Sequence, residues 1–346
     1  MPIFFDFHSI KHMPVVKSKL PIRKRMEYKR PIQAKPTFGI LEFYNKRNKI
    51  LINRACGGLG DILMHRMIFE DFKKLMPNVE IHFSCPTFYH DALTDHPFID
   101  KLLDSNTVNY HDYMVHYNTT TACGRWEVAM SPLSGKHRSD IWANHCGVNL
   151  TSHNMHFRIS DEEKKEGLEI IEKHRDRPGK TVVLSPISAM SNKNMSDDLM
   201  FEVVCELRER GYFVFGLHGC QIFGLYKNDV PTIYGLKLRQ WLSVINQADY
   251  VISVDTSHFH AAGGMHKPVV GVFTFVNAQT YSLYYPNVQL VQGPCPLKYS
   301  GCYDWGKCPK IKESPMLPCC SGITSSSILS AFDNLTSGLK ISCENW

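Results

Sequence analysis

Residues 251–273 constrain the fold of this chain more than any other stretch of its sequence. They read as a buried strand, a polar turn, the start of a helix rich in small residues, and a second apolar strand. A helix that begins directly after a buried strand points its free N–H groups toward one place, which suits a phosphate group. An ordinary βαβ crossover with polar residues at the helix cap is the plain alternative. Both readings predict an α/β fold, and the turn carries a carboxylate, two hydroxyls and two imidazoles on Asp255, Thr256, Ser257, His258 and His260.

A second strand, turn and helix lies near the start of the chain, over residues 49–66. Its turn contains Gly57, Gly58 and Gly60, which let the backbone turn tightly and approach a ligand closely, and Asp61 follows at the helix start. The glycine spacing differs from the dinucleotide-binding fingerprint, and no convincing ribose-binding acid follows the next strand. Open α/β sheets bind ligands at the carboxyl ends of their strands. Two such turns, one in each half of the chain, therefore predict two facing α/β domains with a cleft between them.

The order of these motifs resembles that of glycosyltransferase family 9, whose best-known members are the ADP-heptose:lipopolysaccharide heptosyltransferases. The resemblance rests on Gly-Gly-Leu-Gly-Asp at 57–61, Asp-Thr-Ser-x-x-His at 255–260 and Lys-Pro-Val-Val at 267–270. Further stretches fit in the same order and extend it over roughly residues 49–335: 137–148, 184–193 and 234–249. The chain departs from the family at Ser257, where glycine is usual, and at Met195, where an aromatic residue is common. The resemblance implies an α/β fold of two facing Rossmann-like domains, the GT-B glycosyltransferase architecture.

Strand and helix patterns divide the chain into four predicted parts. These are a basic N-terminal arm (1–40), a first Rossmann-like domain (41–177), a second Rossmann-like domain (178–290), and a cysteine-rich segment with a C-terminal helix (291–346). The resemblance implies that the first of these domains binds the acceptor and the second binds the nucleotide sugar. In the first half we expect strands at 50–53, 80–85, 98–104 and 113–117, and helices at 62–75, 138–146 and 160–174. In the second half we expect strands at 181–186, 213–217, 250–254 and 269–273, and helices at 197–210, 238–247 and the turn of His260.

The composition, with 43% hydrophobic and 21% charged residues, is typical of a soluble globular protein. No apolar run approaches the roughly 20 residues that span a bilayer, so we expect no transmembrane segment. The N-terminus does not read as a signal peptide. In the absence of an export signal, the 12 cysteines are expected to be mostly reduced thiols, and the predicted location is the cytoplasm.

Positive charge is concentrated at the N-terminus. Residues 1–37 hold nine Lys and Arg against Asp6 and Glu27, a net +7, which leaves −1 for the rest of a chain whose total is +6. Such an arm can bind a polyanion: nucleic acid, an anionic membrane surface or an anionic glycan. A solubilising or assembly extension is an equally good interpretation.

Late in the chain, Cys295, Cys302, Cys308 and Cys319 form a candidate structural metal site. Four thiolates bind zinc, or iron as in rubredoxin, but the spacing lacks the Cys-x-x-Cys knuckle, and free thiols in a surface loop are the alternative. Some members of the resembled family carry a comparable cysteine cluster, in certain heptosyltransferases with a metal. That resemblance favours Cys319 over its neighbour Cys320.

The resemblance also implies how the site works. Asp61 is the expected general base that deprotonates the acceptor hydroxyl, although it could simply cap its helix. Backbone N–H groups after Asp255, together with Lys193, would stabilise the leaving diphosphate, so no catalytic cofactor is expected. One base and one displacement imply inversion at the anomeric carbon. The expected donor-binding residues are Ser185, Lys193, His218, Asp255, Thr256, Ser257 and His260, and the expected acceptor-side residues are Gly58, Gly60 and Arg138.

The predicted function is therefore transfer of a sugar (hexosyl, heptosyl or pentosyl) from a nucleotide sugar to an acceptor hydroxyl. The acceptor is a glycan, a protein or, through the basic arm, a hydroxymethylated base in DNA. Two alternatives stay open. A nucleotide-sugar epimerase shares the two-domain architecture, and a non-catalytic sugar-nucleotide binding protein would keep both turns without needing Asp61.

Overall fold

The computed structural model describes residues 48–130, 135–295 and 318–337, and within these ranges it contains two sheets whose strand pairs are all parallel. The first sheet has the order β3-β2-β1-β4 and the second the order β10-β9-β8-β5-β6-β7. The strands of the first sheet are β1 (Lys49–Asn53), β2 (Glu80–Cys85), β3 (Lys101–Asp104) and β4 (Val115–Asn118). Those of the second are β5 (Thr181–Ser185), β6 (Phe213–Leu217), β7 (Thr232–Ile233), β8 (Tyr250–Val254), β9 (Val269–Phe273) and β10 (Val288–Gln292).

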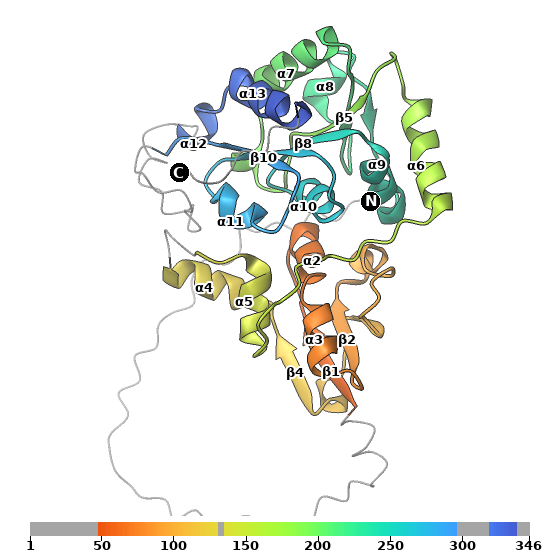
Figure 1. Ribbon diagram of the computed structural model, residues 1–346, viewed down its shortest axis with the longest axis vertical. Coiled ribbons are helices and arrows are strands. Elements are labelled where there is room, and N and C mark those ends of the chain that lie inside the picture. The colour runs from red at the N-terminus through yellow and green to blue at the C-terminus, as the bar shows by residue number, and fades with distance from the viewer. Residues whose placement is uncertain (1–47, 131–134, 296–317, 338–346) are drawn as a thin grey trace, which may run out of the picture.

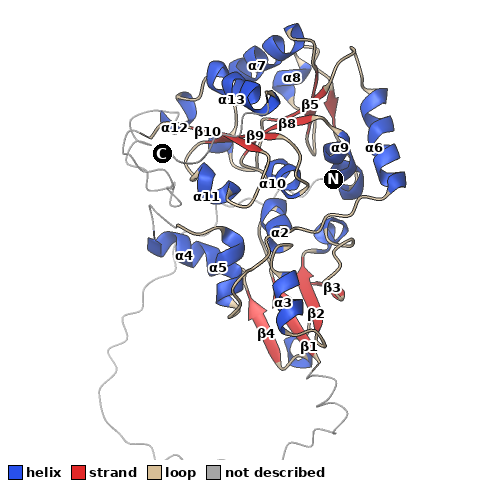
Figure 2. Ribbon diagram, viewed as in Figure 1, coloured by secondary structure: helices blue, strands red, loops and turns tan. Residues whose placement is uncertain are grey.

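Burial explains which strands were predictable. The strands β1, β2, β5, β6, β8 and β9 are almost wholly buried and, apart from β2, largely apolar, as expected where helices cover both faces of a parallel sheet (Figure 2). Their predicted positions are confirmed. The edge strands β3 and β4 are mostly exposed or half-buried and are shorter or shifted relative to the prediction. The sequence analysis missed β7 and β10 altogether.

The parallel registers bring the functional turns to one edge of each sheet. Asn53, at the end of β1, pairs in register with Ser84 on β2 and Asn118 on β4, so the glycine turn after β1 leaves from this edge. In the second sheet Ser185, at the end of β5, pairs with Ser253 on β8. The loop after β5 and the turn after β8 therefore lie side by side.

The helix expected over 62–75 is two helices, α2 (Leu59–His65) and α3 (Phe69–Leu75). Between them the N–H groups of Arg66, Met67 and Ile68 each bond three residues back, which tightens the chain into a turn. Arg66 is fully buried there. Its guanidinium donates to the carbonyl oxygens of Ala92, Met155 and His156 at 2.6, 2.7 and 2.8 Å, and to Asp95 Oδ1 at 2.9 Å.

The remaining described helices complete the two halves. Two helices, α4 (Ala122–Met130) and α5 (Arg138–His145), lie beside the first sheet, and α4 was not predicted. The second sheet is covered by α6 (Asp161–Lys173), α7 (Asp197–Glu209), α8 (Phe223–Tyr226), α9 (Leu238–Gln247), α10 (Ser257–Gly264), α11 (Ala278–Ser282), α12 (Pro318–Ser321) and α13 (Ser325–Thr336). Short 3₁₀ turns are η2 (Thr87–Ala92), η3 (Tyr110–Asp112) and η4 (Ser191–Lys193).

Figure 1 shows the two halves stacked, and α2 of the first half meets α10 of the second. Although α6 precedes residue 178, it packs on α9: Gly167 is so close to Ser243 that a Cβ would lie 2.4 Å from Ser243 Oγ. The domain boundaries given above remain a prediction.

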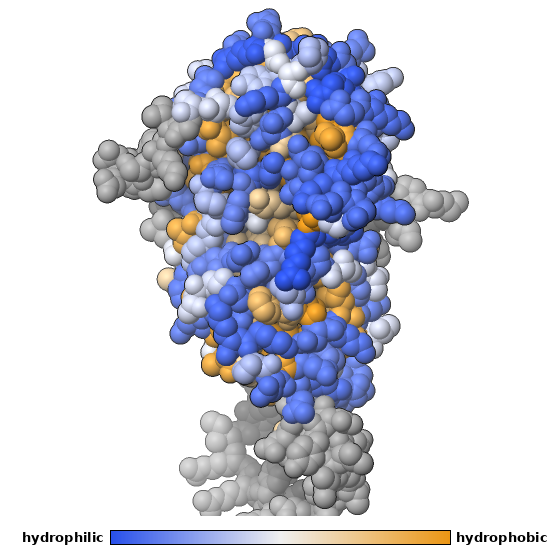
Figure 3. Space-filling model, turned by 45° about the vertical axis from the view of Figure 1, so that its right-hand side comes forward, coloured by the Kyte–Doolittle hydropathy of each residue, from blue (hydrophilic) through white to orange (hydrophobic). Residues whose placement is uncertain are grey.

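The surface seen in Figure 3 is mainly hydrophilic, with hydrophobic residues in scattered patches over both halves. Among the residues that the structure describes, none of the helices has the length and apolar character needed to cross a membrane.

Candidate functional site

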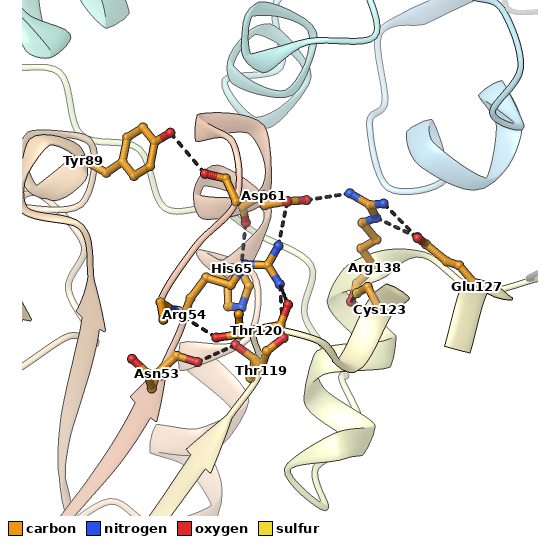
Figure 4. Close-up of polar contacts among 12 residues, drawn as sticks. Asn53, Arg54, Asp61, His65, Tyr89, Thr119, Thr120, Cys123, Glu127 and Arg138 are labelled. Carbon is orange, nitrogen blue, oxygen red and sulfur yellow. Dashed lines mark hydrogen bonds and ion pairs between the residues drawn. The ribbon is translucent and has the colours of Figure 1, made fainter. Parts of the chain in front are cut away.

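Asp61 lies in the first turn of α2, directly after the glycine turn, and two arginines bind it (Figure 4). Arg54 Nη2 donates to Asp61 Oδ2 at 2.7 Å, and Arg138 Nη1 donates to Asp61 Oδ1 at 2.7 Å. Arg54 follows β1 and Arg138 begins α5, so two elements hold the carboxylate. Gly57 has φ +132°, and a Cβ there would lie 2.7 Å from Arg54 Nη2. The positive φ therefore favours glycine here, and an added Cβ would push the Arg54 guanidinium out of its bond to Asp61.

The two arginines fix the ionisation of Asp61. Burial by itself would raise the pKa of this carboxyl group, but the charges of Arg138 and Arg54 outweigh that effect and lower the pKa to about 2. The carboxylate is thus ionised at neutral pH, and each of its oxygens accepts a hydrogen bond from a guanidinium. Each oxygen keeps a further lone pair, so an acceptor hydroxyl can bond to Asp61 while both arginines stay in place.

Arg138 is itself shared between two carboxylates. Its Nε and Nη2 donate to Glu127 Oε1 and Oε2 on α4 at 2.6 and 2.8 Å, which forms a bidentate pair beside the bond to Asp61 (Figure 4). Glu127 is buried, and Tyr281 Oη from the second half of the chain donates to its Oε1 at 3.2 Å. Hydrogen bonds therefore link Asp61, Arg138, Glu127 and Tyr281 in a series that runs from the first half of the chain to the second.

The turn after β8 forms the second part of the site. Asp255 is buried, Lys193 Nζ donates to its Oδ2 at 2.6 Å, and His260 Nε2 lies 3.6 Å from its Oδ1. Burial opposes the charge of Asp255, but Lys193 and His260 outweigh it and hold the pKa of this carboxyl group well below its ordinary range. Thr256 is the N-cap of α10 with extended backbone angles and no side-chain cap bond, and Ser257 is the first helical residue. This first turn follows directly on the carboxyl end of β8.

The two turns are in contact. A Cβ on Gly60 would lie 2.9 Å from His260 Cδ2 and 3.7 Å from the Cα of Ser257. His260 is fixed on its other side because its Nδ1 is 2.9 Å from Tyr285 Oη. The structure therefore brings together Asp61, Gly60 and Arg138 from the first half with Lys193, Asp255, Ser257 and His260 from the second.

Two predicted donor residues lie beside this group. Ser185 ends β5 with a buried Oγ that has no hydrogen-bond partner among the described residues. His218 follows β6, and its ring lies parallel to that of His258 with 6.4 Å between centroids. His258 is buried and its Nε2 accepts a bond from Trp241 Nε1 at 2.8 Å, so it belongs to the core under the turn.

A cavity of about 180 Å³ adjoins Lys193. It lies between the loop after β5, the end of β9 and α12, and its polar lining includes Asn194, Ser196, Thr274 and Ser321. Hydroxyl and amide groups of this kind suit a polar, hydroxyl-rich ligand.

Cys302 and Cys308 of the candidate metal site lie outside the described residues. Cys295 follows β10 and Cys319 is buried in α12. The two segments touch, because a Cβ on Gly293 would lie 1.9 Å from the carbonyl oxygen of Cys319. Within the described part of the chain, no cluster of three or more His, Cys, Asp or Glu side chains could hold a metal ion. The site stays a prediction.

Sequence reasoning missed Arg54, Glu127, Tyr281 and Tyr285. Arg54 lies within the recognised strand, turn and helix over residues 49–66, three residues before Gly57, and its placement there was the available signal. Glu127 is on a helix that was not predicted. Arg138 was predicted as an acceptor-side residue, but no local pattern indicates that it pairs with Glu127. The tyrosines follow β9 in a stretch without a predicted element.

Residues 224–298 match the family model described as glycosyltransferase family 9 (heptosyltransferase), which confirms the predicted resemblance in the second half of the chain. The predicted enzyme class, a glycosyltransferase, is confirmed at the level of this family match. No curated protein matches the chain by sequence.

Solved structures are similar over most of the chain. A family 9 glycosyltransferase from Veillonella parvula has 15% identity and a TM-score of 0.64, covering 85% of this chain and 98% of its own. ADP-heptose lipopolysaccharide heptosyltransferase II of E. coli has 12% identity and a TM-score of 0.58, covering 84% and 99%. The iron-containing dodecameric heptosyltransferase TibC of enterotoxigenic E. coli, in complex with ADP-D-β-D-heptose, has 17% identity and a TM-score of 0.63, covering 85% and 78%. These likenesses confirm the fold class, two facing Rossmann-like domains.

Proposed function

We propose that this chain is an inverting glycosyltransferase that moves a sugar from a nucleotide sugar to an acceptor hydroxyl. The observation that carries the proposal is the contact between Gly60 and His260, which places the turn of Asp61 against the turn of Asp255. A transferase needs a base for the acceptor and an anion site for the leaving group within reach of one another. The family match over residues 224–298 supports the donor half of this arrangement.

On the donor side, the diphosphate would lie at the first turn of α10. The N–H groups of this turn, which starts after Thr256, and the ammonium of Lys193 would stabilise the charge that grows on the leaving phosphate oxygen. Asp255 would keep Lys193 in place through their 2.6 Å bond. The donor to test first is ADP-heptose, because TibC was solved with ADP-D-β-D-heptose and E. coli WaaC with ADP-2-deoxy-2-fluoro heptose.

On the acceptor side, Asp61 would accept the proton of the acceptor hydroxyl. The acceptor oxygen would then bond to the anomeric carbon while the bond from that carbon to the phosphate oxygen breaks, with its electrons going to the diphosphate. A single displacement of this kind inverts the anomeric centre. A free lone pair of Asp61 would accept the bond from the hydroxyl, while Arg138 stays oriented by its bidentate pair with Glu127.

The acceptor we propose is a glycan, a protein hydroxyl or a hydroxymethylated base in DNA. Net charge of +7 on residues 1–37 supports the last of these. We place the protein in a reducing compartment such as the cytoplasm, where its cysteines would stay reduced or bind metal.

The test is a panel of nucleotide sugars, each incubated with glycan, protein and hydroxymethylated DNA, with products read by mass spectrometry. Sugar transfer with inversion supports the proposal. Isomerisation of the donor alone would identify an epimerase, and nucleotide binding with no turnover would identify a binding protein. If DNA is the acceptor, removal of residues 1–37 weakens its binding and flattens the dependence on salt, because fewer counterions are released.

A further inference from the structure

Three tyrosines in the short stretch after β9 contact both halves of the chain, and two of them contact residues of the proposed site. Tyr281 Oη donates to Glu127 Oε1 at 3.2 Å, and Tyr284 Oη donates to Asp140 Oδ2 at 2.7 Å. Tyr285 Oη lies 2.9 Å from His260 Nδ1. The first two bonds reach into the first half of the chain, whereas the third reaches the donor turn of the second half. One segment of five residues thus joins both sides of the cleft.

The contact of Tyr281 leads to the proposed base. Glu127 holds Arg138 through two bonds, and Arg138 donates to Asp61 at 2.7 Å. The guanidinium of Arg138 also lies over the ring of Tyr281, 5.1 Å from its centroid. Because Glu127 and Tyr281 are buried, these bonds act in a low dielectric and restrict the position of Arg138 strongly.

The contact of Tyr285 leads to the proposed donor site. His260 lies between Tyr285 Oη on one side and Asp255 Oδ1, at 3.6 Å, on the other. The ring of Tyr285 packs on Gly263 of α10 so closely that a Cβ there would lie 2.5 Å from it. Tyr285 is therefore fixed relative to α10, and a displacement of the turn at Asp255 is passed to the tyrosine segment.

We propose that Tyr281 and Tyr285 are positioning residues that couple occupation of the donor turn to the orientation of Asp61. Tyr285 acts on the donor side through His260, and Tyr281 acts on the acceptor side through Glu127 and Arg138. This inference rests on the proposed function. Because the two tyrosines belong to one segment, a displacement of the donor turn would change the hydrogen bonds that orient Arg138 and, through it, the carboxylate of Asp61.

The decisive variants are Tyr281→Phe and Tyr285→Phe, with Tyr226→Phe on α8 as the matched control because that side chain is 58% exposed. Loss of a hydrogen bond in a buried site corresponds to a roughly tenfold effect. Tyr281→Phe should lower kcat about tenfold and leave the Kd for ADP within about twofold. Tyr285→Phe should raise the Kd for ADP about tenfold, whereas the control should change neither quantity. If the two tyrosines only stabilise the fold, both variants should instead have a lower Tm, and neither should change kcat or the Kd for ADP selectively.

A second measurement needs no turnover. In a ¹⁵N spectrum of arginine side chains, the Nε–H of Arg138, assigned with Arg138→Lys, should be protected from exchange because it donates to Glu127. Addition of ADP should shift this signal in the wild-type chain and leave it unshifted in Tyr281→Phe and Tyr285→Phe. Folded variants that keep the wild-type response to ADP and wild-type kcat would overturn the coupling. A wild-type chain that binds no nucleotide would instead remove the proposed function, and the coupling with it.

Discussion

Gly60 and His260, from opposite halves of the chain, pack directly against each other. The imidazole of His260 is 2% exposed, and a Cβ on Gly60 would lie 2.9 Å from its Cδ2. Bonds to Tyr285 and proximity to Asp255 leave this ring little freedom to move aside. The turn of Asp61 can therefore approach the proposed donor turn this closely because residue 60 is a glycine and has no side chain.

Replacing Gly60 by alanine should push the two turns apart. We expect Gly60→Ala to reduce sugar transfer about tenfold to a hundredfold, because a shift of about 1 Å between reacting groups has an effect of that size. Circular dichroism should show an unchanged fold. The control is Gly124→Ala on α4, where an added Cβ meets nothing within 4 Å. Full activity in Gly60→Ala would mean that the contact between the two turns does not matter for the reaction.

Asp61→Asn tests the base directly. Turnover should fall roughly a hundredfold or more, while the Kd for ADP from calorimetry stays unchanged. Two guanidinium groups lose a charged partner, so the free energy of unfolding should also fall, by about 1–3 kcal/mol. The exposed Glu162→Gln is the control for loss of one negative charge. Near-normal turnover in Asp61→Asn would leave the carboxylate with the role of a helix cap.

Lys193→Ala tests the leaving-group site. Because its charge serves both the bound diphosphate and the transition state, we expect weaker ADP binding and a lower rate together. The matched control is Lys227→Ala, which removes a surface ion pair with Asp197 at 2.9 Å. Unchanged ADP affinity in Lys193→Ala would move the nucleotide to another part of the molecule.

The cysteine cluster predicts about one structural zinc or iron per chain. Elemental analysis should find the metal, and a chelator should lower Tm, since metal binding contributes to folding. Cys302→Ser should abolish the metal, whereas Cys205→Ser on α7 should not. Metal-free protein of full stability would support free thiols.

Stability should fall when the pH drops below about 6.5. Burial lowers the pKa of His65, His137 and His258 from 6.5 to about 3 each. Between these values the unfolded chain binds protons that the folded chain does not, so each histidine reduces the free energy of unfolding by about 1.4 kcal/mol per pH unit. The stabilising charge of Asp61 is lost only at lower pH, as the pH approaches about 2.

Denaturant titrations between pH 7 and 4.5 check this dependence. His258→Gln should reduce the slope of the free energy of unfolding against pH by the contribution of about one proton. The control, His116→Gln, replaces an exposed residue of β4. Equal slopes in both variants would argue against a neutral His258 in the folded chain.

The sequence allowed the two-sheet architecture and much of the proposed site to be predicted. The turns at Asp61 and Asp255 were recognisable because glycine spacing and helix-start residues are local features. Glu127 was not, since its pairing with Arg138 depends on how two helices pack, and Tyr281 reaches it only after the halves have come together. The edge strands β3 and β4 lack the continuous burial that makes a strand visible as an apolar run.

The break between α2 and α3 has a similar cause. Residues 62–75 carry an uninterrupted helical pattern. The turn at Arg66 places its buried guanidinium among carbonyl oxygens that lie far along the sequence, and these hydrogen bonds stabilise the break. Only the tertiary structure reveals those oxygens.

That buried guanidinium also bears on how the protein is made. Arg66 needs the carbonyl oxygens of Met155 and His156, which leave the ribosome long after the first sheet is complete. Until they arrive, a buried charge lacks part of its hydrogen bonding, at a cost of several kcal/mol. We therefore expect the first half to stay loosely packed during translation and to reach its final packing only after the segment that leads into the second half has left the ribosome.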